Sequence, residues 1–412
     1  MSSYSSSAAW AWALAVWALA TCPSALRGEE PSAHESPAVL TAQPSVYLRP
    51  LPDVSPGAQG PSRPQQVPGL LTSTVDAPMP VSAGALAPVA RRAAATTTPQ
   101  PAAPTAREHE VWLVSTRRLS ALPSAGSVPA FTPDVYRYTA GRGWMPASLD
   151  ELMQPSPQAV TSIFVHGNDT NAEAAVSDGL GLFSQLAGGP PAQATRFIIW
   201  SWPIEMTGLR VRRSAQTNAT RSGIEGYFLA GFIRRLGAVP QVSMLGYSSG
   251  AGVVTGALHV LGGGALEGGR LALPPAALQT KIDAVLLGAA TPNDWLLPGR
   301  THERALEAVN RLVVTVNSED AVLHWYRMLW GRTGPTALGS SGVASVPALG
   351  AAQSRLVQVN LESALGRNHG WTYYTQSQQV VSLLRYELLD LPAQLVAKAV
   401  RPVNPVRTVR AP

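Results

Sequence analysis

The chain has 412 residues, of which 45% are hydrophobic, with a formal net charge of +6 at pH 7 and one cysteine. A single cysteine excludes a fold held together by disulfides within the chain, so the folded part must be stabilised by a hydrophobic core. The basic residues are mostly scattered arginines without interleaved aromatic side chains, which argues against nucleic-acid binding.

The N-terminus has the pattern of a secretory signal peptide. Residues 8–20 are apolar but too few to span a bilayer comfortably, and Ala18-Leu19-Ala20 fits a cleavage site. Residues 1–7 contain no Lys or Arg, so an uncleaved anchor and a misassigned start codon are the alternatives. We expect residues 1–20 to direct export to the periplasm, the cell envelope or the medium. Cys22 would add a membrane tether if it were lipidated, although Thr21 is a poor residue before a lipidated cysteine.

The rest of the chain divides by composition. Residues 21–107 are dominated by Ala, Pro, Ser and Thr without a hydrophobic period, which predicts a disordered linker. Residues 108–390 contain regular apolar segments and form the predicted folded domain, and residues 391–412 form a tail.

Apolar strand-like runs alternate with amphipathic segments through this domain. The predicted strands are 110–116, 134–138, 160–165, 195–200, 239–245, 282–288, 311–317 and 356–360. The predicted helices are 171–186, 217–236, 249–262, 301–309, 320–330 and 371–387. This alternation predicts an α/β fold, with a mostly parallel twisted sheet, helices on both faces and an antiparallel edge formed by the early strands. Insertions at 203–214 and 331–353 are expected to shape a pocket.

The segment Gly246-Tyr247-Ser248-Ser249-Gly250 links a predicted strand directly to a helix rich in small residues. This is the Gly-x-Ser-x-Gly nucleophile elbow in its required setting. The serine must occupy a strained turn so that its hydroxyl stands clear of the sheet, and the glycines leave room where strand and helix cross. Ser248 is therefore the candidate nucleophile.

A serine nucleophile needs a histidine base that is oriented by a carboxylate. Asp320 and His369 each follow the carboxyl end of a predicted strand, where the active sites of open α/β sheets gather, and they come in the order that this fold requires. Asp294, which follows another strand, is the alternative acid, and Glu319 should point to the other side of its turn. The remaining candidate bases are less suitable because they lie inside or at the start of helices: His259, His302 and His324.

The site also needs main-chain donors for an oxyanion. The N–H of Ser249 is the first candidate, and the N–H of Asn168, in a loop after strand 160–165, is the second. Trp200 and Trp202 follow the next strand and either wall the substrate pocket or pack in the core.

Together these motifs resemble the α/β-hydrolase superfamily, and the wider pattern is similar to a group of functionally uncharacterised bacterial α/β-hydrolases. The likeness covers about residues 109–388 and is carried by segments 112–117, 164–168, 200–203, 317–323 and 368–374. It implies the α/β-hydrolase fold, with Ser248 as nucleophile, Asp320 as acid and His369 as base. By the same likeness His166 transfers no proton. It shapes the loop after strand 160–165 that contains Asn168, called the oxyanion loop below.

The sequence thus predicts a serine hydrolase that cleaves a small-molecule or lipid-like carboxylic ester through an acyl-enzyme, with amides and thioesters as less favoured substrates. The alternative is a non-catalytic binding protein of the cell envelope with the same fold. No metal or organic cofactor is expected, because the chain lacks His-Glu-x-x-His, paired cysteines and a dinucleotide fingerprint after its first strand. Neither insertion is a long apolar lid, which argues against a lipase. The oligomeric state is not predicted.

Overall fold

The computed structural model describes residues 109–119, 130–155, 160–168, 170–188, 194–204, 211–236, 239, 241–275, 280–330 and 334–389, with the side chains of 211–217 left out. The predicted signal peptide (1–20), Cys22, the linker (21–107) and the tail (391–412) lie outside these residues. The domain boundaries and the lipidation of Cys22 therefore stay predictions.

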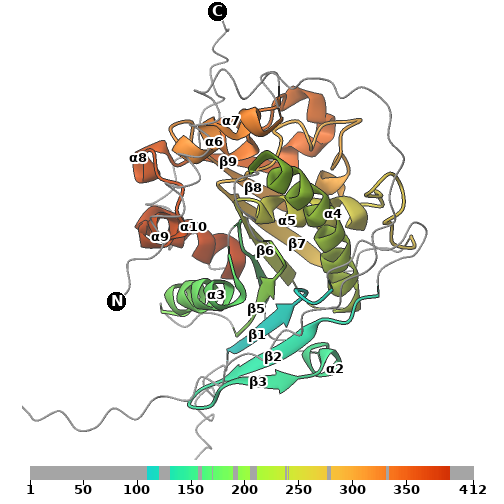
Figure 1. Cartoon of the computed structure of the whole chain (residues 1–412), viewed down its shortest axis with the longest axis vertical. Coiled ribbons are helices and arrows are strands. Elements are labelled where there is room, and N and C mark those ends of the chain that lie inside the picture. Colours follow the sequence, from blue (N-terminus) through green and yellow to red (C-terminus); the bar gives the residue numbers. More distant parts are fainter. Residues whose placement is uncertain are drawn as a thin grey trace, which may run out of the picture. The chain divides into compact units, whose positions relative to one another are not determined.

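The described residues form one nine-stranded sheet in the order β3-β2-β1-β5-β4-β6-β7-β8-β9 (Figure 1). The strands are β1 (Glu110–Ser115), β2 (Asp134–Thr139), β3 (Gly143–Ala147), β4 (Val160–Val165), β5 (Thr195–Ser201), β6 (Gln241–Tyr247), β7 (Lys281–Leu287), β8 (Arg311–Val316) and β9 (Leu356–Asn360). In the run β1-β5-β4-β6-β7-β8-β9, each strand pairs in parallel with its neighbours. In contrast, β2 pairs antiparallel with both β1 and β3. The predicted antiparallel edge is confirmed, although its outermost strand, β3, was not predicted.

Helices cover both faces of this sheet. They are α2 (Leu149–Leu152), α3 (Ala172–Ala187), α4 (Val211–Arg235), α5 (Gly250–Leu261), α6 (Ala321–His324), α7 (Leu338–Ser341), α8 (Glu362–Leu365), α9 (Trp371–Gln376) and α10 (Gln378–Leu389). Alternate side chains of the strands enter two cores, one shared with α4 and α5 and the other with α3, α9 and α10 (Figure 1). The α/β fold class predicted from the sequence is confirmed.

The strand order reverses at β4. The chain runs from β4 through α3 to β5 on one side and returns through α4 to β6 on the other. Because the parallel strands end at one edge of the sheet, the loops after β4 and β6 meet at this reversal, which is where open α/β sheets bind ligands. The register confirms the proximity, since Val165 is paired with Gly246.

Some predicted helices differ in the structure. The segment 301–309 forms only a 3₁₀ turn, Ala305–Glu307, because the main-chain N–H of His302 donates to Trp295 O (2.8 Å) in the preceding loop. The helix predicted at 320–330 is split into α6 and a 3₁₀ helix, Tyr326–Trp330. Leu323, Tyr326 and Leu329 share one small core, and their spacing of three residues suits 3₁₀ geometry.

The last predicted helix is split into α9 and α10 at Ser377, which has an extended backbone. The Ser377 hydroxyl accepts a hydrogen bond from the N–H of Val380 (3.4 Å) and so caps α10. The start and end predicted for α3 are confirmed, because Asn171 caps its first turn and Gly188 follows its last residue.

The two predicted insertions are described in part, since residues 205–210 and 331–333 lie outside the described ranges. The second contains α7 and a 3₁₀ helix, Pro347–Arg355. It packs on the loop after β7, where the N–H of Leu338 donates to Thr291 O (2.7 Å) and that of Gly339 to Ala289 O (2.9 Å).

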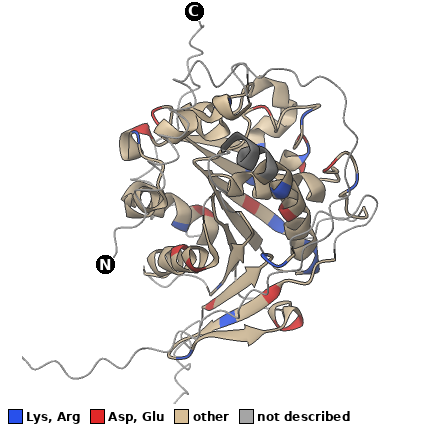
Figure 2. Ribbon diagram, viewed as in Figure 1, with Lys and Arg blue, Asp and Glu red and all other residues tan. Residues whose placement is uncertain are grey.

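Charged side chains of both signs are interspersed along the described strands and helices (Figure 2). In this part of the chain, no helix has the length and apolar character needed to cross a membrane.

Candidate functional site

Ser248 lies in the turn between β6 and α5 with a φ of +52°, a left-handed conformation that is rare for a residue with a side chain. Hydrogen bonds to the neighbouring strand connection hold this turn: the Ser248 N–H donates to Leu287 O (2.9 Å), and the Ala290 N–H donates to Ser248 O (3.1 Å). The structure therefore contains the strained elbow that the motif predicts.

Both glycines of the elbow are required by close packing. A Cβ on Gly246 would lie 2.8 Å from the Cα of Ala251, and one on Gly250 would lie 2.6 Å from His166 O. Because these contacts are with main-chain atoms, a larger residue could not be accommodated by a change of rotamer.

The side chains of Ser248, His369 and Asp320 form one chain of hydrogen bonds. Ser248 Oγ lies 3.0 Å from His369 Nε2, and His369 Nδ1 lies 2.7 Å from Asp320 Oδ2. All three residues are buried, with exposed fractions of 6%, 9% and 0% respectively. The structure thus brings together the three residues that the sequence placed after separate strands.

Asp320 is fixed by its own helix. Its Oδ1 accepts the main-chain N–H groups of Val322 (2.9 Å) and Leu323 (3.0 Å) at the start of α6. The other oxygen therefore faces His369 Nδ1, and we assign the ring proton to Nδ1, which leaves Nε2 free to accept the hydroxyl proton of Ser248.

The alternative residues lie elsewhere. The carboxylate of Asp294 is 3.4 Å from Arg300 Nε, and Glu319 is exposed.

The alternative bases have other partners. His259 accepts the N–H of Arg304 (3.2 Å), and His302 bonds Thr255 (2.9 Å). His324 is exposed and packs edge-to-face on Trp325. Among the described residues, none of these five candidates forms a hydrogen bond with the side chain of Ser248 or His369.

Tyr247 supports His369, and sequence reasoning missed this residue because it occupies the variable second position of the motif. Its hydroxyl donates to His369 O (2.5 Å), and its ring stacks on the imidazole with a centroid distance of 5.7 Å. Burial raises the pKa of the Tyr247 hydroxyl, so the group stays protonated and remains a donor.

Gly288 makes room beside His369. It has a φ of +52°, and a Cβ there would lie 3.2 Å from His369 Cε1 and would also collide with the hydroxyl of Tyr374. The imidazole can approach the end of β7 only because this position has no side chain.

The loop after β4 lies against Ser248. A Cβ on Gly167 would be 2.9 Å from Ser248 Cβ, which places the Gly167–Asn168 peptide beside the serine. Among the described residues, no acceptor is found for the main-chain N–H of Asn168 or of Ser249. The side chain of Asn168 accepts a hydrogen bond from Asn218 Nδ2 (3.3 Å) on α4. Both predicted oxyanion donors are therefore near Ser248 and without a main-chain partner in the described part of the chain.

Trp200 and Trp202 are both 0% exposed. Trp200 stacks on Phe131, with a centroid distance of 6.0 Å, and Trp202 Nε1 donates to His166 O (3.0 Å). These positions fit the packing role that the sequence left open for both residues, and neither of them lines the cavity described next.

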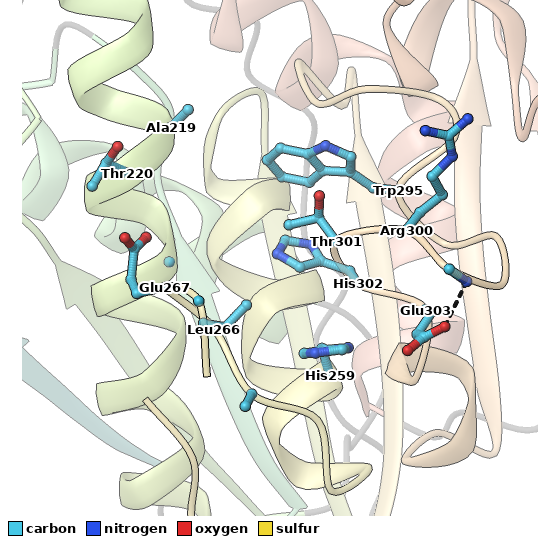
Figure 3. A pocket seen from close by; sticks show the side chains of 14 residues that line it. Ala219, Thr220, His259, Leu266, Glu267, Trp295, Arg300, Thr301, His302 and Glu303 are labelled. Atoms are coloured by element: carbon cyan, nitrogen blue, oxygen red, sulfur yellow. Dashed lines mark hydrogen bonds between the residues drawn. The ribbon is translucent and has the colours of Figure 1, made fainter. Parts of the chain in front are cut away.

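A surface cavity of about 550 Å³ lies between α4, α5 and two loops (Figure 3). Trp295 and His302 lie on one side of it, and Glu267 lies across from them beside α4 (Figure 3). Burial lowers the pKa of His302 to about 3, so its ring is neutral. Ser248, Asp320 and His369 are not part of its lining, so the cavity is distinct from the hydrogen-bonded triad. In the described residues, no group of three or more His, Cys, Asp or Glu side chains is placed to hold a metal ion.

No family model and no curated protein matches the sequence. Two solved structures are similar to parts of the chain. One is a putative cell surface hydrolase from Lactobacillus plantarum WCFS1, with 13% identity, 59% of this chain and 97% of that chain covered, and a TM-score of 0.34. The other is the lin2722 gene product of Listeria innocua, with 11% identity, 57% and 95% covered, and a TM-score of 0.32. The fold described above rests on the strand order and does not depend on these matches.

Proposed function

We propose that this protein is a serine hydrolase that cleaves a carboxylic ester through an acyl-enzyme. The observation that carries the proposal is the continuous chain from Ser248 Oγ to His369 Nε2 (3.0 Å) and from His369 Nδ1 to Asp320 Oδ2 (2.7 Å). A nucleophile, a base and an orienting acid in hydrogen-bond reach are the parts that acyl transfer needs.

In the proposed mechanism, the Ser248 hydroxyl attacks the ester carbonyl while His369 Nε2 takes its proton. The main-chain N–H groups of Asn168 and Ser249 stabilise the oxyanion of the tetrahedral intermediate. The protonated His369 then donates its proton to the leaving alcohol, so that the acyl group remains on Ser248. His369 next takes a proton from water as the water oxygen attacks the acyl-enzyme. It then returns this proton to Ser248 Oγ as the bond between Oγ and the acyl carbon breaks and the carboxylic acid is released. Asp320 stabilises the imidazolium in both halves of the reaction.

Esters are proposed rather than amides because an alkoxide leaves more readily than an amine and needs less help from the acid. We propose a small-molecule or lipid-like ester as the substrate. The described parts of the two insertions contain no long apolar lid, which argues against a lipase. Export remains a proposal that rests on residues 1–20 and would be tested by mass spectrometry of the N-terminus after cell fractionation.

The test is covalent labelling with a fluorophosphonate, together with hydrolysis of p-nitrophenyl esters of increasing acyl length. We expect wild type to be labelled on Ser248 and Ser248→Ala to lose labelling and all but about one part in 10⁵ to 10⁶ of the turnover. Ser184→Ala is the matched control, because Ser184 is exposed on α3 and its hydroxyl donates to Gly181 O (2.8 Å) within the same helix. A folded wild type that is neither labelled nor active would contradict the proposal and favour a non-catalytic binding protein.

A further inference from the structure

Polar residues at the carboxyl ends of three strands have no part in the proposed chemistry. They meet beside the oxyanion loop. Thr116 and Arg117 follow β1, Ser201 ends β5, and His166 follows β4. In the sheet these strands are neighbours in the order β1-β5-β4, so their carboxyl ends lie side by side. Residues separated by up to 85 positions in the chain thus share one partly buried polar network.

Arg117 connects the three strand ends. Its Nε donates to Ser201 Oγ (2.8 Å), and its Nη2 donates to Thr170 O (2.6 Å) and lies 3.3 Å from His166 Nε2. His166 and Thr170 stand on either side of Asn168, so one guanidinium holds the loop at both ends. A lysine could not reproduce these contacts, because it presents a single point charge in place of a planar fork of donors.

His166 carries this restraint to the main chain. Its Nδ1 bonds Gly167 O (2.9 Å), while Nε2 accepts from the N–H of Trp202 (3.2 Å) and faces Arg117. Burial lowers the pKa of His166 to about 3, so the ring is neutral, and a proton on Nδ1 satisfies all of these contacts. His166 is therefore held on both ring nitrogens.

The bond to Gly167 O sets the direction of the proposed oxyanion donor. Gly167 O and the N–H of Asn168 belong to the same peptide unit, and that unit is trans. In a trans peptide the C=O and the N–H point in opposite directions. Fixing the carbonyl toward His166 thus points the N–H of Asn168 away from His166, at the opposite edge of the same peptide unit.

We propose that Arg117 is a positioning residue that aims the Asn168 N–H at the oxyanion through His166 and Thr170, an inference that rests on the proposed function. Arg117 does not touch the reacting atoms. It acts by keeping the donor in place before the oxyanion forms, and such preorganisation is the source of oxyanion-hole catalysis.

Two other arginines give matched controls. Arg118 is the next residue, but its side chain is 78% exposed and pairs with Asp134 on the surface. Arg196 is also held by several partners, Glu110 (2.8 Å), Leu152 O (2.9 Å) and Gln154 O (3.0 Å), yet it lies at the amino end of β5. Arg196 thus tests the effect of removing a buried structural arginine far from the oxyanion loop.

The experiment measures kcat and KM per active site, with the number of active sites counted from the end point of fluorophosphonate labelling. We expect Arg117→Lys to lower kcat per active site about 10- to 100-fold, less than deletion of a donor, with KM within about 2-fold. Arg118→Lys should be unchanged. Arg196→Lys should lower the melting temperature but not the rate per active site. Added guanidinium should partly restore Arg117→Ala, and methylammonium should not.

The outcomes separate the two proposals. If wild type is active and Arg117→Lys keeps its full rate per active site, the positioning role is overturned and the hydrolase remains. If wild type is neither labelled nor active, the hydrolase fails. Hydrogen exchange of a peptide that covers residues 166–170 then decides the role of Arg117 in ordering the loop. Faster exchange in Arg117→Ala than in Arg118→Ala supports that role, and equal exchange overturns it.

Discussion

The two sides of Ser248 are built in different ways. On the acid–base side, Asp320 is held by the first N–H groups of its own helix, and His369 is held through its main chain by Tyr247, the residue next to the serine. On the oxyanion side, the loop around Asn168 is held by a network that combines three strand ends. The first side is held by separate hydrogen bonds to individual residues, whereas on the second a single guanidinium joins the ends of three neighbouring strands.

The two sides should therefore respond differently to amino-acid substitutions. A residue of the acid–base side can be exchanged with a local effect on one proton transfer, because its neighbours are fixed independently. A residue of the oxyanion network supports several loops at once, so its exchange should affect several segments together. The predictions below test this contrast.

Among the substitutions that test this contrast, the largest effect is expected for Asp320→Asn. Asparagine keeps the shape but can no longer hold His369 in the tautomer with the proton on Nδ1, so kcat should fall about 10⁴-fold. Steady-state hydrolysis of p-nitrophenyl esters measures the change, and Asp294→Asn serves as the control because Asp294 bonds Arg300 instead. If the Asp294 variant lost activity and the Asp320 variant did not, the acid would have been assigned to the wrong strand.

Gly250→Ala tests the junction between the two sides. The new methyl group would collide with the main-chain oxygens of Val165 and His166, so β4 and α5 would have to move apart. We expect a loss of about 1–3 kcal/mol in the free energy of unfolding. Urea unfolding measures it, with Gly181→Ala as the control, because a Cβ on Gly181 meets nothing within 4 Å. Because Gly181 lies on an exposed part of a helix, Gly181→Ala should raise the free energy of unfolding by about 0.5–1 kcal/mol.

An unchanged stability in Gly250→Ala would mean that strand and helix are packed less tightly there than the structure shows. It would also remove the reason for a glycine at the end of the motif.

The same contrast explains how much the sequence could predict. The proximity of Ser248, Asp320 and His369 could be predicted because each directly follows a strand with a clear apolar signal, and parallel strands end at one edge. Arg117 could not be given a role, because its partners become neighbours only through the order β1-β5-β4, which local patterns do not specify. Tyr247 was missed because its side chain serves a residue 122 positions further along the chain.

The burial of individual side chains was the other feature that the sequence could not predict. Whether Trp200 lines a pocket or packs in the core depends on what covers it, and in the structure the covering residues include Phe131 and Phe232. The helix predicted at 301–309 failed for a related reason, because the tertiary hydrogen bond from His302 N–H to Trp295 O replaces the helical pattern.

Glu225 allows a test of the oxyanion side by pH. This carboxyl on α4 is buried and accepts hydrogen bonds from Thr116 Oγ1 (2.7 Å) and Trp200 Nε1 (3.3 Å). Burial raises its pKa from 4.5 to about 7, so the folded protein binds this proton more tightly than the unfolded chain does. The resulting stability is complete below about pH 4.5 and is lost as the pH rises through 7.

In Glu225→Gln this pH dependence should vanish, because glutamine does not titrate. Relative to the variant, wild type should lose up to about 3 kcal/mol in the free energy of unfolding between pH 4.5 and pH 8. Only the difference between the two proteins is used, since Asp178 also has a pKa raised by burial, to about 6. Parallel curves for the two proteins would mean that Glu225 does not change its charge in this range.

The smallest effect is expected for Tyr247→Phe, which removes one hydroxyl and leaves the stacked ring in place. Loss of the hydrogen bond to His369 O should cost about 0.5–1.5 kcal/mol, so kcat per active site should fall about 2- to 10-fold with KM unchanged. Tyr373→Phe is the control, because Tyr373 is 43% exposed. If Tyr247→Phe lowers the melting temperature but keeps its full rate per active site, the base is held by its own loop alone. The residues of the acid–base side would then depend on one another even less than the structure indicates, and the contrast with the oxyanion side would become sharper.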